Sequence, residues 1–140
     1  MKKFAAALVL LLAVPAQAQQ AQLDPAQFLN FGLQVTNNLE QGRAAMVWER
    51  ATAAFKASVP KDRFVAMANQ NHQARGTVVS RVWQSITRSK IRVSDRPLVE
   101  RPLVIITFAS TTNRNVTFYE TVQFSLEADN LWHTANYTSQ

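Results

Sequence analysis

The chain has 140 residues, with 15 Lys and Arg against 9 Asp and Glu, a formal net charge of +6 and no cysteine. This length corresponds to one domain that can bury a core without cross-links. The lack of cysteine excludes disulfides and thiolate chemistry. The modest positive charge is not the dense basic stripe of a nucleic-acid-binding protein, so we expect no nucleic-acid partner.

Residues 1–18 have the three parts of a secretory signal peptide. Lys2 and Lys3 precede an apolar run over residues 4–14, and Ala16 and Ala18 give the small-x-small cleavage pattern. The run is shorter than the roughly 20 residues that span a bilayer. We therefore expect cleavage after Ala18, a periplasmic or secreted protein, and no stable membrane insertion. The mature chain would have 122 residues and a net charge of +4, since Lys2 and Lys3 are removed.

A glutamine-rich segment over residues 19–24 is expected to be a flexible leader, followed by one domain over residues 25–140. Asp24 and Pro25 are suited to an N-cap and a first helical position. Apolar side chains then recur at spacings of three and four and mark one face of a helix that ends near Gly42. These side chains are Phe28, Phe31, Val35 and Leu39.

Two more helices are indicated before Gly76. The second covers residues 44–59 and ends before Pro60. Its apolar stripe consists of Ala44, Trp48, Ala51, Phe55 and Val59. The third covers residues 61–75, with Phe64, Ala68 and His72 on one line.

After Gly76 the composition becomes β-branched and aromatic, which favours strands. We expect a long strand over residues 77–93 with a bulge near Gln84, and a loop over residues 95–102, where two prolines occur. Three further strands are expected over residues 103–111, 116–126 and 131–138. Helices followed by strands joined through short turns predict an α+β fold, with two to three N-terminal helices packed on one face of a curved four-stranded antiparallel sheet.

Three segments resemble the bacterial domain of unknown function 4019 family, whose members are generally small exported proteins: RAAMVWERATAAFKASV, ARGTVVSR and FYETVQFSLEADNLWHTANY. The resemblance runs from about Gln27 to Tyr137. It implies a fold similar to the nuclear transport factor 2-like (cystatin-like) α+β fold, in which a curved sheet cups a pack of helices. That fold hosts both enzymes and binding modules, so the resemblance fixes no function. The matching residues are Trp48, Phe55, Lys56, Gly76, Ser80, Arg81, Glu120, Thr121, Val122, Trp132 and Tyr137.

Glu120 is the most informative candidate, because its carboxylate lies midway along a row of apolar side chains on one strand face. That row consists of Val116, Phe118, Val122, Phe124 and Leu126. One interpretation is a general acid or base in a cup-shaped cavity. The other is a structural ion pair, with Arg81 on another strand as its partner.

Further candidates for such a cavity are Tyr119, Trp132 and, as a second catalytic group beside Glu120, His133. The two histidines, His72 and His133, have no neighbouring ligands at metal-binding spacing. We therefore expect neither a metal site nor a cofactor. Residue spacing also shows no nucleophile motif and no glycine-rich phosphate loop.

Arg88, Lys90 and Arg92 alternate along the end of the first strand and would share one exposed face. One interpretation is a docking surface for an anionic partner. The other is a solvated hairpin whose cations protect a sheet edge from aggregation.

The sequence favours a non-catalytic module in the periplasm or outside the cell that binds an unidentified small molecule or envelope protein. The alternative is a small cavity enzyme, an isomerase or hydrolase, that uses Glu120 with His133 or Tyr119. A homodimer through the outer sheet face is a third hypothesis, for which an exposed Phe108 or Trp83 would be the sign.

Overall fold

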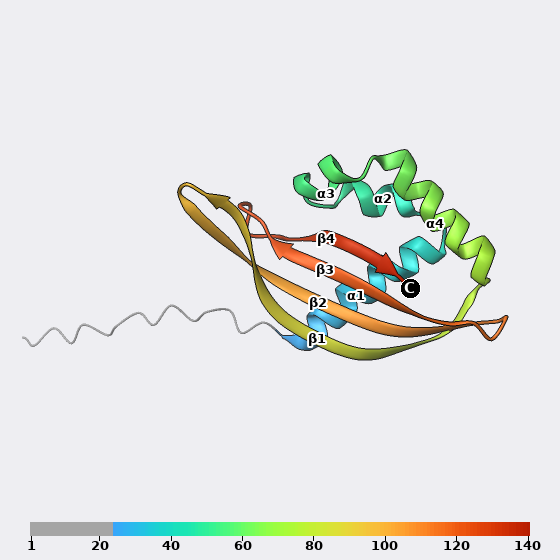
Figure 1. Cartoon of the computed structure of the whole chain (residues 1–140). Coiled ribbons are helices and arrows are strands. Elements are labelled where there is room, and N and C mark those ends of the chain that lie inside the picture. The colour runs from blue at the N-terminus through green and yellow to red at the C-terminus, as the bar shows by residue number, and fades with distance from the viewer. Residues whose placement is uncertain (1–23) are drawn as a thin grey trace, which may run out of the picture.

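The computed structural model describes residues 24–140, so the signal peptide expected over residues 1–18 and the leader expected after it, up to residue 23, lie outside the described residues. Four helices precede four strands (Figure 1). The helices are α1 (Pro25–Glu40), α2 (Ala44–Glu49), α3 (Ala53–Ser58) and α4 (Lys61–Arg75). The strands are β1 (Val78–Asp95), β2 (Leu98–Thr112), β3 (Thr117–Leu126) and β4 (Trp132–Ser139). They form one open antiparallel sheet in the order β1-β2-β3-β4, which confirms the α+β class.

Helix α1 begins and ends as its sequence predicts. The Asp24 Oδ1 atom accepts a hydrogen bond from the backbone N–H of Ala26 at 2.9 Å, which makes Asp24 the N-cap. After the helix, Gly42 takes a left-handed φ of 72°, a conformation that glycine adopts without strain. The expected apolar face points to the sheet and buries Phe28, Val35 and Leu39.

The prediction of a single helix over residues 44–59 is wrong, because residues 50–52 are not helical and separate α2 from α3. At the break Ala51 forms a parallel bridge with Thr134, and the Thr52 N–H donates to the Thr134 carbonyl at 2.9 Å. The Thr52 hydroxyl then caps α3 by accepting from the Phe55 N–H at 3.1 Å. The backbone leaves the helix because it pairs with the edge of β4 and because threonine is a good N-cap.

Helix α4 is confirmed over the expected range. It buries Phe64 and Ala68, whereas the side chain of His72 on the same line is 40% exposed. Gly76 follows with a φ of 88° and lets the chain turn into β1.

The prediction of a loop over residues 95–102 is also wrong. Strand β1 reaches Asp95 and β2 starts at Leu98, so the hairpin turns at Arg96 and Pro97. Pro102 is accommodated inside β2 because the pairing of β2 with β3 begins only at Leu103. The bulge expected near Gln84 is confirmed, as the register of β1 shifts between Trp83 and Ser85.

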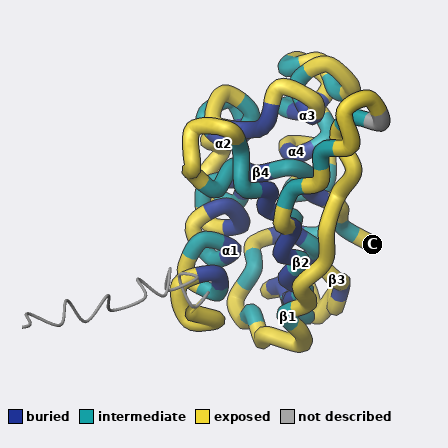
Figure 2. The backbone as a smooth tube through the Cα atoms, turned by 90° about the vertical axis from the view of Figure 1, so that its left-hand side faces the viewer, coloured by how far each residue is buried: buried dark blue, intermediate teal, exposed yellow. Residues whose placement is uncertain are grey.

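The core lies between α1 and one face of the sheet, with α2, α3 and α4 gathered towards the β4 edge (Figures 1 and 2). Even-numbered residues of β2 and β3 point to this core face, including Val104, Ile106, Phe108 and Val122. Phe108 is therefore 1% exposed, so the hypothesis that it lies exposed on the outer sheet face, as a homodimer contact, is wrong.

Candidate functional site

The Glu120 carboxylate is buried in the core face of β3 and receives three side-chain hydrogen bonds. Arg81 Nε donates to its Oε2 atom at 2.7 Å and the Ser110 hydroxyl to the same oxygen at 2.5 Å. The Tyr137 hydroxyl donates to Oε1 at 2.9 Å. Glu120 is 3% exposed, so an ionised carboxylate here depends on these donors in place of water.

Arg81 brings its positive charge to Glu120 from the edge strand β1. Its side chain is 9% exposed, and its Nη1 atom also donates to Asn37 Oδ1 of α1 at 3.0 Å. The Nη2 atom is buried and has no hydrogen-bond partner among residues 24–140. The ion pair expected between Glu120 and Arg81 is therefore present, and it links the sheet to α1.

Tyr137 reaches Glu120 because of an irregularity in β4. Phe124 pairs with Thr134 and Gln123 with Asn136, so Ala135 is an extra residue in β4. Thr134 and Tyr137 consequently both face the core, three positions apart, and Tyr137 is 9% exposed. Burial, and then the charge of Glu120, raise the pKa of Tyr137 well above its usual value.

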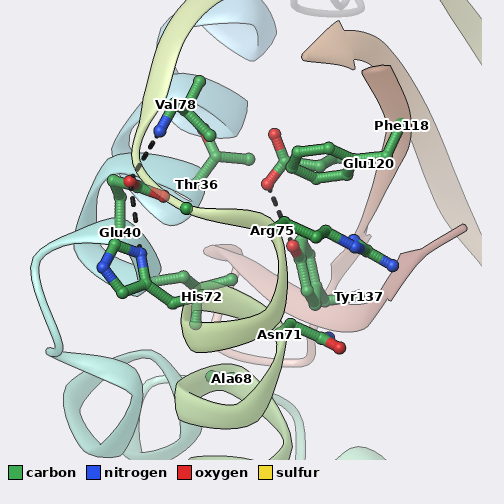
Figure 3. A pocket seen from close by; sticks show the side chains of 12 residues that line it. Thr36, Glu40, Ala68, Asn71, His72, Arg75, Val78, Phe118, Glu120 and Tyr137 are labelled. Atoms are coloured by element: carbon green, nitrogen blue, oxygen red, sulfur yellow. Dashed lines mark hydrogen bonds and ion pairs between the residues drawn. The ribbon is translucent and has the colours of Figure 1, made fainter. Parts of the chain in front are cut away.

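A small cavity of about 30 Å³ adjoins this network between α1, α4 and the sheet (Figure 3). On its wall Glu40 Oε1 accepts from the Val78 N–H at 2.9 Å and lies 3.3 Å from His72 Nδ1. Arg75 places its guanidinium 4.4 Å from the ring centre of Phe118, in a cation–π contact. This volume accommodates one or two water molecules, whereas ligand pockets measure roughly 300–1,000 Å³.

The other cavity candidates lie away from Glu120. Tyr119 precedes it on β3, points to the opposite sheet face and is 54% exposed. Trp132 packs edge-on against Phe28, with ring centres 4.7 Å apart, and lines a separate hollow of about 200 Å³ between α1, α2 and β4.

His133 pairs in register with Ser125, towards the other end of β3 from Glu120. Its Nε2 atom lies 2.8 Å from Asp129 Oδ2 and its Nδ1 atom 3.1 Å from the Arg50 carbonyl. The hydrogen bond to Asp129 raises the pKa of His133. The structure thus brings Glu120 and Arg81 together but not Glu120 with His133 or Tyr119.

The three cations of the basic candidate surface lie on one face of β1 and are exposed. Lys90 Nζ is 3.7 Å from Glu100 Oε2, and Arg88 and Arg92 also have interaction partners. Trp83 is 52% exposed, but it pairs with Phe108 and so lies at the edge of the core face, beside the start of α1, and not on the outer face.

The sequence patterns do not predict two of the three donors to Glu120, which are Ser110 and Tyr137. They also do not predict the hydrogen bond from Arg81 to Asn37. Ser110 was detectable in principle, because it is a hydroxyl residue on the core face of β2, next to Phe108 in the alternation. The position of Tyr137 follows from the bulge, which strict alternation does not predict.

Within residues 24–140, no group of three or more His, Asp or Glu side chains is arranged to hold a metal ion. Over the same range, no helix combines the length and the apolar character needed to cross a membrane.

The sequence of the chain matches one protein-family model. The family model described as "Protein of unknown function (DUF4019)" matches residues 32–137, which include the helices from within α1 onwards and nearly all of the sheet. The comparison with curated proteins gives no match. The match covers most of the described domain, and the chain therefore belongs to the DUF4019 family.

Proposed function

We propose that this chain is a non-catalytic binding module that acts in the periplasm or outside the cell, after cleavage behind Ala18. Its ligand is a small molecule or an envelope protein. The signal-like start of the sequence supports the location. The arrangement of helices on one face of a curved four-stranded sheet supports a nuclear transport factor 2-like fold, which we also propose.

One observation carries the proposal that the module is not an enzyme. The Glu120 carboxylate is occupied by donors from Arg81, Ser110 and Tyr137, and the adjoining space is water-sized. A general acid or base must reach the atom from which it takes a proton, or to which it gives one. A carboxylate in this environment supports a structural role, in which its charge balances Arg81.

The experiment is native mass spectrometry of the mature protein purified from its own envelope, combined with a Glu120→Gln variant. We expect a molecule or partner that co-purifies with the protein and that the protein does not convert chemically. We also expect the Glu120→Gln variant to be less stable than the wild type, because Arg81 is left buried without its counter-ion. A Glu120→Gln protein that keeps its stability but no longer converts the co-purified molecule would favour the cavity enzyme instead.

A homodimer is a separate proposal. Because Trp83 is exposed on the core-face side of the β1 edge, it supports a contact between copies at that edge and not through the outer sheet face. Sedimentation velocity at two protein concentrations tests it. A sedimentation coefficient that does not rise with concentration, and that matches the monomer, would contradict a dimer.

A further inference from the structure

A groove of about 420 Å³ lies on the sheet face opposite the core, near the tip of the β1–β2 hairpin. Its position follows from the register of the strands. Val104 and Phe124 point into the core, so the neighbouring Leu103 and Ser125, which pair with each other, point to the other face. The start of α3 closes one side of the groove with Ala53 and Ala54.

Much of the wall of the groove is aliphatic, although the hydroxyl residues Thr52 and Ser94 also line it. Ile91 and Val93 of β1 and Val99 of β2 line it, and both Ile91 and Val93 are about two-fifths exposed at 40% and 43%. No aromatic side chain is among its lining residues. The volume falls in the range of small-molecule sites, and the lining suits an aliphatic chain better than a flat aromatic ring.

Ser125 supplies an unused hydrogen-bonding group in this groove. It is 3% exposed, and its hydroxyl has no hydrogen-bond partner among residues 24–140. Buried polar groups are nearly always paired, and an unpaired one lowers stability. A ligand that hydrogen-bonds to Ser125 would remove this cost.

The charges in the groove cancel. Arg101 and Glu127 both line it and form an ion pair with each other through Arg101 Nη1 and Glu127 Oε2. A charged ligand would have to compete with one member of this pair for the other. An uncharged ligand faces no such competition.

We propose that this groove binds a small aliphatic molecule with an uncharged hydrogen-bonding head, such as a medium-chain amide or alcohol. The chain lies against Ile91, Val93 and Val99, and the head bonds to Ser125. The inference rests on the proposed binding function and gives that function a site.

The test is an NMR titration of the ¹⁵N-labelled mature protein with three probes of equal chain length: octanamide, octanoate and octylammonium. We expect octanamide to cause saturable shifts at Ile91, Val99 and Ser125. The two charged probes should bind at least several-fold more weakly. Tighter binding of octanoate or octylammonium, or shifts confined to other residues, would overturn the proposal.

Two variants assign the binding to the groove. Ala53→Phe fills it from the exposed start of α3 and should weaken octanamide binding at least tenfold, whereas Ala57→Phe, exposed on the same helix but outside the groove, should leave it unchanged. Ser125→Ala removes the hydroxyl and should weaken binding about threefold to tenfold without loss of folding. Equal binding by wild type and Ala53→Phe would refute the site.

The outcome is separable from that of the proposed function. If mass spectrometry finds a co-purified molecule that the Ala53→Phe variant still binds, the proposed binding function would be supported, but its site would lie outside this groove. If no molecule co-purifies but octanamide binds saturably, the groove would be supported as a binding site. The expectation of a ligand that co-purifies with the protein would then be contradicted.

Discussion

Arg81 on the edge strand β1 and Glu120 on β3 form an ion pair that spans the intervening strand β2, with Nε and Oε2 2.7 Å apart. Ser110 of β2 lies between them and donates to the same carboxylate oxygen. One buried charge pair thus joins three strands, and Asn37 extends the contact to α1. Removal of either charge leaves the other without water and without a counter-ion.

A double-mutant cycle measures this coupling. Arg81→Met and Glu120→Leu should each lower the free energy of unfolding by about 3–5 kcal/mol, because each leaves one buried charge unpaired. The double variant should lose less than the sum, since it leaves no unpaired charge. Urea unfolding gives the three values.

The exposed pair Lys90 and Glu100 provides the control for this cycle. Their side chains are 72% and 41% exposed, so Lys90→Met and Glu100→Leu should couple by less than about 1 kcal/mol. Additive effects at Arg81 and Glu120 would contradict the interpretation of a mutually dependent buried pair.

Tyr137 predicts a loss of stability at alkaline pH. Its pKa is raised in the folded protein, so the native state keeps a proton that the unfolded chain releases above about pH 10. The stability linked to this proton is complete below that pH and is lost as the pH rises towards the folded pKa. Urea unfolding at increasing alkaline pH should show this decline.

Tyr137→Phe is the matched variant for the alkaline effect. It has no phenol at this position, so its stability should fall less steeply above pH 10. It should also be about 1.5–3 kcal/mol less stable at neutral pH, because Glu120 loses one donor. Equal alkaline slopes for the two proteins would contradict the assignment to Tyr137.

The raised pKa of His133 predicts a second pH effect on stability, around neutral pH and not at alkaline pH. Its pKa is raised, chiefly by the hydrogen bond to Asp129, so protonation favours the folded state. The contribution is complete below the ordinary histidine pKa of about 6.5 and is lost as the pH rises through the raised value. The thermal midpoint of wild type relative to His133→Asn should therefore decrease between pH 5.5 and 8.5 (about the range of histidine titration). A constant difference would rule out this linkage.

Gly76 and Gly42 allow a comparison of two glycine positions. Both have a positive φ, but a Cβ at Gly76 would lie 2.5 Å from Asn113 Oδ1, whereas a Cβ at Gly42 would have no atom within 4 Å. Gly42→Ala should cost about 1–2 kcal/mol from backbone strain alone. Gly76→Ala should cost more, because Asn113 must also give up its bond to the Thr77 N–H. Chemical denaturation of both variants tests the order.

Local patterns predicted the elements whose boundaries are set by local chemistry. Asp24 and Pro25 define the start of α1, Gly76 ends α4, and the apolar row around Glu120 correctly indicated a buried carboxylate. These features depend on side chains near one another in the sequence, so the sequence alone was sufficient.

The features that were missed depend on contacts between distant segments. The break between α2 and α3 arises where Ala51 and Thr52 pair with Thr134 of β4. The groove at Ser125 likewise exists only because the start of α3 meets the far end of the sheet. Helical periodicity continues through residues 44–59 and gives no sign of either contact.

The additional residue in β4 makes the length of this strand as important as its composition. If β4 lost this bulge at unchanged length, strict alternation from Thr134 would place Asn136 in the core and turn the Tyr137 phenol outward. Deletion of Ala135, by contrast, would remove the bulge and leave Tyr137 opposite Val122, with its side chain still directed to the core. Family members with one residue fewer between the positions of Trp132 and Tyr137 should therefore have a regular β4 and still present the residue at the Tyr137 position to their buried acid. A one-residue gap at that spacing in an alignment of this family then marks the loss of the bulge and not a change in the side chain that enters the protein interior.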